Sequence, residues 1–335
     1  MKISKIYSTR NSNKEVYSHL IYEWEDDYSK YLKIPIYSFN GIKDRFLRYF
    51  FKIAKKIKID RLIQKIDSFR KPKSYSLIFE LYPRNYFSFQ VFSNKVPHII
   101  DFDYNVDIYA FYNVYKNCKL VLISNLEAYN YLRANNCPLN IVHLPLSISN
   151  KHKLNINPVK NKEIDLIVVR SNKVFMEYLE QFANINTNFE YVERKWDGEL
   201  YKNNVYYSNK RGVLGEFSER NSYLKLLRNS KVALYATPGF DENTKRFMNH
   251  VTPSLFEFVS SGCQIIARYP KNYETDFFNL EKISPHIDTY EKFEKLLTSY
   301  INNDSNDYLK ESETFLETVY TKCQVEKLRL IINNN

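Results

Sequence analysis

The sequence predicts an α/β protein with two domains of ordinary size. Short apolar runs alternate with longer amphipathic stretches, a pattern typical of parallel sheets whose strands are connected by helices. At 335 residues the chain is long enough for two such domains. Residues 150–162 are polar and without periodicity, so we expect a linker there. The predicted domains are residues 1–150 and 151–310, and residues 311–335 form a closing helix that crosses back to the first.

The first half begins with a short strand over residues 2–7, which ends in a polar turn. From residue 74 onward the alternation becomes regular. Apolar runs that read as strands take turns with stretches of helical periodicity. We expect strands at 74–81, 96–103, 120–125 and 141–146, and helices at 108–116 and 127–134.

The second half opens with an apolar run at 164–169, and its most informative segment is 231–276. There a short apolar strand leads through a polar loop into a helix, and a second apolar strand follows. The helix is predicted to begin at Thr252-Pro253, because Thr is a good N-cap and Pro at the first position gives up a donor that would be unpaired anyway. Gly262 ends it. A helix start beyond the carboxyl end of a parallel strand binds phosphate, and a carboxylate one turn further can hold ribose hydroxyls.

At these residues the chain resembles the nucleotide-sugar-binding half of two-domain (GT-B) glycosyltransferases. The pattern T-P-x-x-F-E-x-x-x-S-G-C/T-x-I-I of that group matches the run from Thr252 to Ile266. Weaker similarities in the same order extend the resemblance over roughly residues 95 to 295. The resemblance implies two Rossmann-like domains facing a central cleft, with the acceptor on the first and the donor on the second.

The resemblance also implies roles for single residues. The start of the helix would face the donor pyrophosphate, and Glu257 would contact the donor ribose. Two cations after the strand at 164–169 would pair with the diphosphate, since opposite charge favours that contact. The predicted donor-site residues are Thr252, Pro253, Ser254, Glu257, Arg170, Lys173, His250, Asn249, Tyr235 and Thr237.

One position departs from the family pattern. Many relatives have two glutamates eight positions apart, and here Asn249 stands eight positions before Glu257. Either the first carboxylate is missing, or its role has moved to Asp241, Glu242 or His250.

Asp101-Phe102-Asp103 forms a D-x-D sequence at the end of a predicted strand. In another glycosyltransferase architecture such a pair binds a metal ion, because two oxygens on one side of a cation fit this spacing. Here the pair lies in the other half of a two-domain pattern, so we expect no metal ligation. We predict that Asp101 and Asp103 are catalytic, one of them accepting the proton of the acceptor hydroxyl. A capping or turn role is the alternative.

Residues 42–66 carry nine Lys or Arg and two Asp, more than half of the net charge of +11. On a helical projection an apolar side stands opposite a basic side. Such a helix suits an anionic membrane surface, and the alternative is a domain helix whose apolar side faces the core. The apolar side has Phe46, Leu47, Phe50, Ile53, Ala54 and Ile57, and the basic side has Arg45, Arg48, Lys52, Lys55 and Lys56.

Composition favours a protein kept in the cytoplasm, with peripheral attachment to the inner face of the plasma membrane as an option. The N-terminal residues lack the apolar core of a signal peptide, and no apolar run is long enough to span a bilayer. Four cysteines without paired spacing suggest reduced thiols and no zinc site.

Together these observations predict a metal-independent glycosyltransferase without a bound cofactor. It would move a sugar from a nucleotide diphosphate to a lipid-linked or cell-surface glycan. Helix-terminal N–H groups and cationic side chains would stabilise the departing diphosphate in place of a metal. The alternatives are a catalytically inactive glycan-binding or scaffold protein, and a basic nucleic-acid-binding protein. No recognised nucleic-acid motif supports the latter, and we expect no nucleic-acid partner.

Overall fold

The computed structural model describes residues 1–13, 15, 18–155, 162–170, 172–195, 205–242, 248–302 and 306–334. Part of the predicted linker, residues 156–161, lies outside these ranges. The chain divides into two compact units. The first contains Met1–Asn150 and Tyr320–Asn335, together with the short segment that includes Met248, and the second contains the rest.

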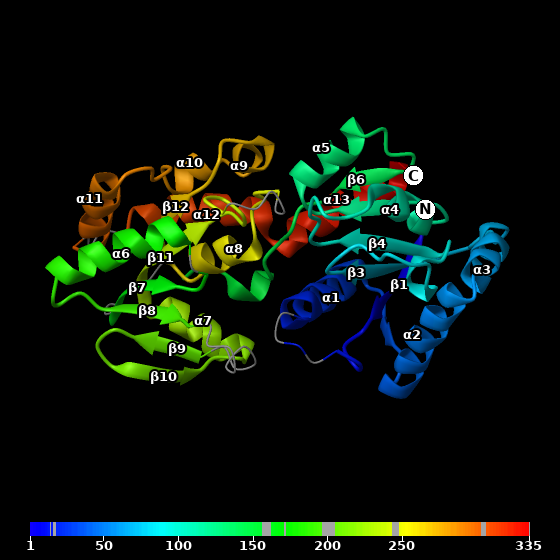
Figure 1. Cartoon of the computed structure of the whole chain (residues 1–335), viewed down its shortest axis with the longest axis horizontal. Helices are drawn as coiled ribbons and strands as arrows, with labels where there is room; N and C mark the ends of the chain where they lie inside the picture. The colour runs from blue at the N-terminus through cyan, green and yellow to red at the C-terminus, as the bar shows by residue number, and fades with distance from the viewer. Residues whose placement is uncertain are drawn as a thin grey trace. The chain divides into compact units, whose positions relative to one another are not determined.

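The first unit is built on a parallel six-stranded sheet with the order β2-β1-β3-β4-β5-β6 (Figure 1). Its strands are β1 (Ile3–Ser8), β2 (Ile36–Ser38), β3 (Tyr75–Glu80), β4 (Lys95–Ile99), β5 (Val121–Ile123) and β6 (Ile141–His143). Its helices are α1 (Ser18–Leu32), α2 (Gly41–Lys56), α3 (Ile59–Ser68), α4 (Ile108–Tyr115), α5 (Leu126–Ala134) and α13 (Thr321–Asn334), with a 3-10 turn η1 (Phe89–Val91).

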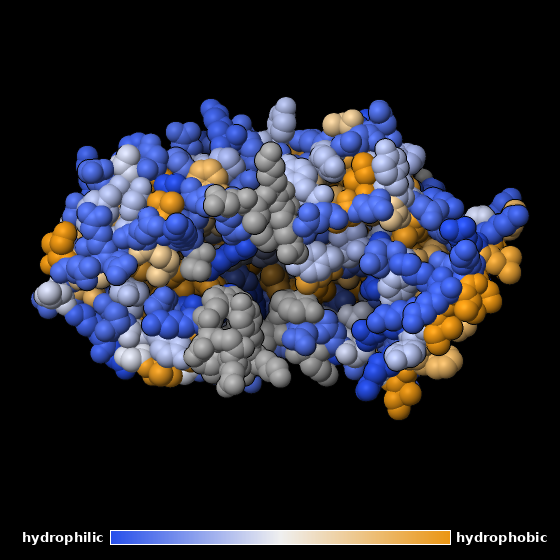
Figure 2. Space-filling model, in the orientation of Figure 1, coloured by the Kyte–Doolittle hydropathy of each residue, from blue (hydrophilic) through white to orange (hydrophobic). Residues whose placement is uncertain are grey.

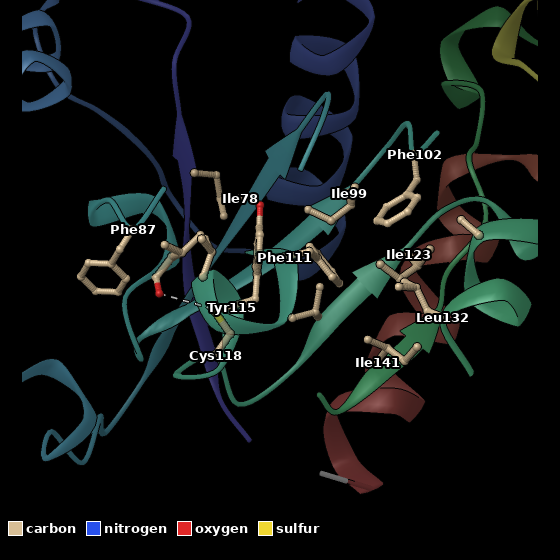
Figure 3. Packing of buried hydrophobic residues seen from close by; sticks show 14 of the residues in the cluster. Ile78, Phe87, Ile99, Phe102, Phe111, Tyr115, Cys118, Ile123, Leu132 and Ile141 are labelled. Carbon is tan, nitrogen blue, oxygen red and sulfur yellow. Dashed lines mark hydrogen bonds between the residues drawn. The ribbon is translucent and has the colours of Figure 1, made fainter. Parts of the chain in front are cut away.

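The sheet of the first unit is covered on both faces. On one face, strand side chains such as Ile78 and Ile99 pack with Phe111 of α4 and with residues of α2 and α5 (Figure 3). The neighbouring residue Phe79 points the other way, and its ring packs 5.2 Å from that of Tyr28 in α1. This alternation is the one expected of a strand buried on both sides.

The second unit has a six-stranded sheet with the order β10-β9-β8-β7-β11-β12. Four strands are parallel, and β9 and β10 are antiparallel additions at one edge. Its strands are β7 (Ile164–Val168), β8 (Tyr191–Arg194), β9 (Val205–Ser208), β10 (Gly212–Glu216), β11 (Ser230–Ala236) and β12 (Gln264–Arg268). Its helices are α6 (Lys173–Ile185), α7 (Arg220–Arg228), α8 (Pro253–Ser260), α9 (Tyr273–Phe277), α10 (Leu280–Ile283), α11 (Tyr290–Ile301) and α12 (Tyr308–Val319), and the 3-10 turn η2 (Asn150–His152) spans the boundary between the two units in the chain.

The end of the chain differs from the single helix expected over residues 311–335. Helix α12 ends at Val319 and belongs to the second unit, while α13 belongs to the first. The break lies at Tyr320, which forms a bridge with Ile148. Within the first unit Arg329 of α13 donates to the carbonyl of Tyr31 at 2.5 Å, so α13 lies beside the end of α1. In the described ranges no helix has the length and apolar character needed to cross a bilayer.

Candidate functional site

The second sheet reverses its winding between β7 and β11. From β7 the chain proceeds to β8 on one side, whereas β11 lies on the other side. In open α/β sheets, ligands bind beyond the carboxyl ends of the strands at such a switch point. Arg170 lies two positions after the end of β7. Tyr235 is the penultimate residue of β11, and Thr237 follows that strand. Three of the predicted donor-site residues therefore come from the two strands that flank the switch point.

Helix α8 begins at Pro253 with Thr252 as its N-cap residue, as the sequence predicts. The backbone N–H of Thr252 donates to the hydroxyl of Tyr235 at 3.0 Å. Its side chain does not cap the helix backbone; instead the hydroxyls of Thr252 and Ser254 lie 2.7 Å apart. The positive end of the helix dipole is thus surrounded by hydroxyl groups and tied to the end of β11.

The charge of Arg170 influences the pKa of Tyr235. The tyrosine is buried, and burial is the main reason that its pKa is raised to about 12. The hydrogen bonds with Thr252 and the positive charge of Arg170 act in the opposite direction. The exposed guanidinium of Arg170 is therefore within electrostatic range of the hydroxyl that holds the start of α8. This arrangement joins a cation, a helix start and two strand ends, which is suited to binding a diphosphate.

Glu257 is buried one turn into α8 and belongs to a polar network. Arg220, the first residue of α7, forms an ion pair with its carboxylate. The hydroxyl of Tyr223 donates to the second carboxylate oxygen at 3.1 Å. Burial, followed by the negative charge of Glu257, raises the pKa of Tyr223 well above its ordinary value, so this hydroxyl stays a donor. A carboxylate has about four lone-pair sites, so these two contacts leave capacity for a ribose hydroxyl.

The region around Asn249 contains the departure from the family pattern. Asn249 has a left-handed backbone with φ of 52°, and its carbonyl accepts from the side chain of Asn272 at 3.2 Å. Its side-chain oxygen is buried and has no hydrogen-bond partner within the described residues. His250, next in the chain, is buried.

Asp241 and Lys173 have structural surroundings that the sequence does not reveal. Both oxygens of Asp241 accept from the guanidinium of Arg268 at 2.8 Å, and this contact holds the pKa of Asp241 below its usual range. Asn172 caps α6 and donates to Asp241 at 3.1 Å. Asp241 is therefore already bound within its own unit, which weakens it as a substitute for the missing glutamate. Lys173 is the exposed first residue of α6.

A pocket of about 500 Å³ lies beside this region in the second unit. None of the predicted donor-site residues lines it. It is formed by Phe240, Tyr269, Pro270, Lys271, Thr275, Asp276, Asn279, Leu280, Glu281 and His286.

In the first unit, Asp101 and Asp103 follow β4, which is not one of the strands at the switch point of that sheet. Asp103 is buried, and its carboxylate accepts from the backbone N–H of Asn105 at 2.9 Å. This contact is the turn role that the sequence leaves open as an alternative. Across the described residues, no three His, Cys, Asp or Glu side chains gather as a metal site.

The switch point of the first sheet lies between β1 and β3, because β2 and β3 flank β1. A pocket of about 660 Å³ opens there, lined by Thr9 and Asn13 after β1 and by the loop after β3. It lies where open α/β sheets bind ligands. The full lining is Thr9, Asn13, Ser18, Ile21, Tyr22, Arg48, Phe79, Glu80, Leu81, Tyr82, Pro83, Arg84, Asn85, Tyr86 and Gln90.

Two arginines of this pocket are each held by a buried carboxylate. Arg48 pairs with Asp44 at 2.6 Å, and Arg84 pairs with Glu80 at 2.7 Å. The side-chain oxygen of the buried Gln90 and the Nε of Arg48 have no hydrogen-bond partner among the described residues. The charges that line the pocket are thus balanced, and tyrosine side chains lie beside them.

The sequence analysis predicted neither this pocket nor the contacts of Glu257 with Arg220 and Tyr223. One feature of the sequence could have indicated the pocket. Tyr82-Pro83-Arg84 follows an apolar strand in the same way that Arg170 follows another. The Arg220 pairing had no such signal, because 37 residues separate the two partners.

No protein-family model and no curated protein sequence matches the chain. Solved structures do. The N-terminal domain of trehalose-6-phosphate phosphatase from Candida albicans is 13% identical, with a TM-score of 0.54 over 99% of this chain and 96% of its own. A DNA-modifying β-glucosyltransferase is 12% identical, with a TM-score of 0.50 over 99% of this chain and 100% of its own.

A chain of the GtfA/B complex is 10% identical, with a TM-score of 0.49. The match covers 82% of the present protein but only 60% of the longer GtfA/B chain. At such identities the likeness is one of fold. The chain has the two-sheet α/β fold of GT-B glycosyltransferases, and the predicted fold class is confirmed.

Proposed function

We propose that this protein is a glycosyltransferase of the hexosyltransferase type. It moves a sugar from a nucleotide-diphosphate donor to a glycan acceptor. One observation at the switch point of the second sheet carries the proposal. The backbone N–H of Thr252, at the start of α8, donates to the hydroxyl of Tyr235 in β11 at 3.0 Å. The charge of Arg170 acts on the same hydroxyl.

In this proposal the donor diphosphate faces Thr252, Pro253 and Ser254, where the helix dipole and backbone N–H groups favour negative charge. Arg170 stabilises the charge that develops as the diphosphate leaves. Glu257 holds the ribose, and Arg220 orients the Glu257 carboxylate through their ion pair. These groups do the work of a metal ion, so transfer proceeds without one.

The remaining donor residues have positions that fit supporting roles. Tyr235 and Thr237 lie at the end of β11 and line the base pocket in this proposal. His250 and Asn249 lie in the loop that leads into α8, and Lys173 starts the helix that follows Arg170.

The acceptor is a lipid-linked or cell-surface glycan of the lipopolysaccharide or capsule type, and the process is polysaccharide biosynthesis in the cytoplasm. The pocket at the switch point of the first sheet supports an acceptor site in that unit. The proposed base is Asp101 or Asp103, which would accept the proton of the acceptor hydroxyl. Both residues follow β4 and lie outside the lining of this pocket, so the reacting hydroxyl would extend beyond the pocket toward them. The enzyme works at an anionic membrane surface, which it contacts through residues 42–66.

Two other functions remain as alternatives. A catalytically inactive glycan-binding protein is favoured by Asn249, whose buried side-chain oxygen has no partner in the described residues. DNA as an acceptor is suggested by the DNA-modifying fold neighbour and by the net charge of +11. Against DNA stands the concentration of that charge beside exposed apolar side chains in α2 and α3.

The deciding experiment measures thermal stabilisation by a panel of nucleotides and nucleotide sugars, followed by transfer and hydrolysis assays with the donor that binds. Binding to the native state raises apparent stability by mass action. We expect one nucleoside diphosphate sugar to stabilise the protein and to be turned over. Binding without turnover supports the inactive alternative, and a DNA mobility shift at physiological salt without nucleotide binding would refute the main proposal.

A further inference from the structure

The first unit exposes an unusual amount of apolar surface on α2 and α3. Among the described residues, nineteen large apolar side chains are exposed, and ten of them lie between residues 42 and 69. In Figure 2, orange hydrophobic surface follows the outer edge of these two helices. We call this surface the α2–α3 apolar face; its members are Ile42, Phe46, Tyr49, Phe50, Ile53, Ile57, Ile59, Leu62, Ile66 and Phe69.

Helix α2 uses a different side to contact the core. Phe51 and Ala54 are buried in the first unit, and Leu47 packs against the same core. Phe46 and Ile53, by contrast, are 68% and 50% exposed. The sequence left open whether one apolar side faces the core or a membrane. In the structure, only Leu47 and Ala54 of that apolar side face the core. Its other members, Phe46, Phe50, Ile53 and Ile57, are exposed.

Helix α3 has polar side chains inside and apolar side chains outside. Its inward side carries the buried polar residues Gln64 and Asp67, beside Ile63, which packs against the core. Asp67 accepts from the backbone N–H of Ser93 at 2.7 Å. Its outward side carries Leu62, at 57% exposure, and Ile66, at 56%, and the C-cap residue Phe69 is 75% exposed. A surface helix of a water-soluble domain normally turns its apolar side to the core and its polar side to water. The exposed apolar side chains of α3 therefore indicate a contact partner other than water.

Basic side chains border the apolar face. In α2, the exposed residues Arg45, Lys52 and Lys56 lie on one flank of it. In α3 and the turn before it, further exposed Lys and Arg residues continue the border. Residues 42–66 contain nine Lys or Arg against two Asp, and one of those Asp residues, Asp44, is already paired with Arg48.

We propose that the α2–α3 apolar face inserts into the interface of an anionic phospholipid membrane. The apolar side chains enter the acyl boundary, and the basic border contacts the headgroups. Helices with a wide apolar face and Lys or Arg beside it lie in this way in membrane interfaces. The membrane contact is therefore mainly hydrophobic, and it uses the part of the predicted apolar side that does not face the core.

Charge argues against the other occupants of this face. A second copy of the chain would bring two strongly basic surfaces together, and like charges across an interface are costly. A nucleic acid would satisfy the basic border but would leave the apolar side chains in water. An anionic bilayer satisfies both at once. This inference does not depend on the proposed catalytic function.

The test is flotation with vesicles of phosphatidylcholine, with and without phosphatidylglycerol. The apolar-face variant is Phe46→Ser, Phe50→Ser and Ile53→Ser. The control is Tyr109→Ser, Val213→Ser and Leu330→Ser, which removes three large side chains elsewhere that are 64–78% exposed, against 43–68% for the apolar-face positions. All six positions are exposed, so both variants should fold, as circular dichroism would verify.

We expect wild type and control to float with phosphatidylglycerol vesicles. The apolar-face variant should lose more than about tenfold in affinity at low and at high salt, because burial of apolar area is not screened. Replacing Arg45, Lys52 and Lys56 by Gln should weaken binding at about 0.15 M salt and have less effect at about 1 M, where charge is already screened.

A second variant gives a direct reading of insertion depth. In Phe50→Trp, emission of the introduced tryptophan should shift to the blue on vesicle binding and be quenched by brominated acyl chains, relative to wild type. Wild-type protein that ignores anionic vesicles at low salt, or an introduced tryptophan that is not quenched in the bound state, would overturn the proposal. A dimer that dissociates in the apolar-face variant without vesicles would assign the face to a second copy instead.

Discussion

Thr252 donates its backbone N–H to the hydroxyl of Tyr235 at 3.0 Å, so the residue before α8 is anchored to the penultimate residue of β11. Pro253 has no N–H to offer, and the side chain of Thr252 is engaged with Ser254. The hydroxyl of Tyr235 therefore serves as the hydrogen-bond acceptor for the Thr252 N–H. This hydroxyl orients the helix start that the proposed function assigns to the diphosphate.

Replacing Tyr235 by Phe should test this anchor. The partly buried N–H of Thr252 would lose its acceptor, which costs about 1 kcal/mol of unfolding free energy, the low end of the range for buried groups. Donor binding should weaken as the helix start loses its orientation. The measurements are urea unfolding and nucleotide-sugar titration. Tyr178→Phe removes a tyrosine hydroxyl that donates to the Asp288 carbonyl at 3.1 Å, and it should leave donor binding unchanged. If Tyr235→Phe and Tyr178→Phe bind the nucleotide sugar equally well, the hydrogen bond between Tyr235 and Thr252 does not contribute to donor binding.

Replacing Glu257 by Gln should raise the donor dissociation constant by roughly tenfold to a hundredfold, since hydrogen bonds to charged groups are worth about 1.5–3 kcal/mol. Arg220→Gln should have a smaller effect, because Arg220 orients the carboxylate and does not contact the ribose in our proposal. Glu190→Gln breaks another carboxylate–arginine pair of the same unit, with Arg211 at 2.7 Å, and serves as the control. If Arg220→Gln weakens donor binding as much as Glu257→Gln, Glu257 has only a structural role.

The start and end of α8 can be predicted from sequence because their signals are local. Thr252-Pro253 fixes the first turn. Gly262 adopts φ of 71° after the last one, a left-handed conformation that glycine adopts without strain. The bond between Tyr235 and Thr252 is not predictable in this way. It joins residues 17 positions apart, and it depends on how β11 and α8 pack.

Periodicity likewise shows that α2 has an apolar stripe but not which way it faces. Phe51 and Phe50 are neighbours in the sequence, yet one is buried and the other is 43% exposed. Asp44 lies on the inward side with the buried Phe51 and Ala54, and it accepts from the hydroxyl of Tyr7 at 3.3 Å. A buried polar partner of that kind is visible only in three dimensions. The hairpin of β9 and β10 was also missed, since its residues alternate weakly.

Chelation of divalent ions should leave transfer intact. The reason is that the start of α8 and Arg170 take over the stabilisation of the leaving diphosphate. The measurement is the initial rate with and without EDTA. Asp103→Asn retains an acceptor for the Asn105 N–H and should preserve stability. If EDTA abolishes transfer and Mg²⁺ or Mn²⁺ restores it, Asp101 and Asp103 must be reconsidered as metal ligands.

The last prediction concerns acid stability and His98. This residue of β4 is buried, with Nε2 2.8 Å from the hydroxyl of Ser124 and 3.0 Å from the carbonyl of Leu144. Its Nδ1 has no hydrogen-bond partner within the described residues. Protonation would place a charge there without compensation, and burial lowers the pKa of His98 from 6.5 to about 4.

A folded-state pKa below the unfolded value means that the unfolded chain binds the proton first. Stability from His98 is complete above pH 6.5 and is lost as the pH falls toward 4, by up to about 3 kcal/mol. Glu25 acts in the opposite direction, because burial raises its pKa to about 7. Comparing wild type with His98→Gln cancels that contribution. Urea unfolding across this range should show a steeper acid loss in wild type than in the variant, and equal slopes would contradict the assignment.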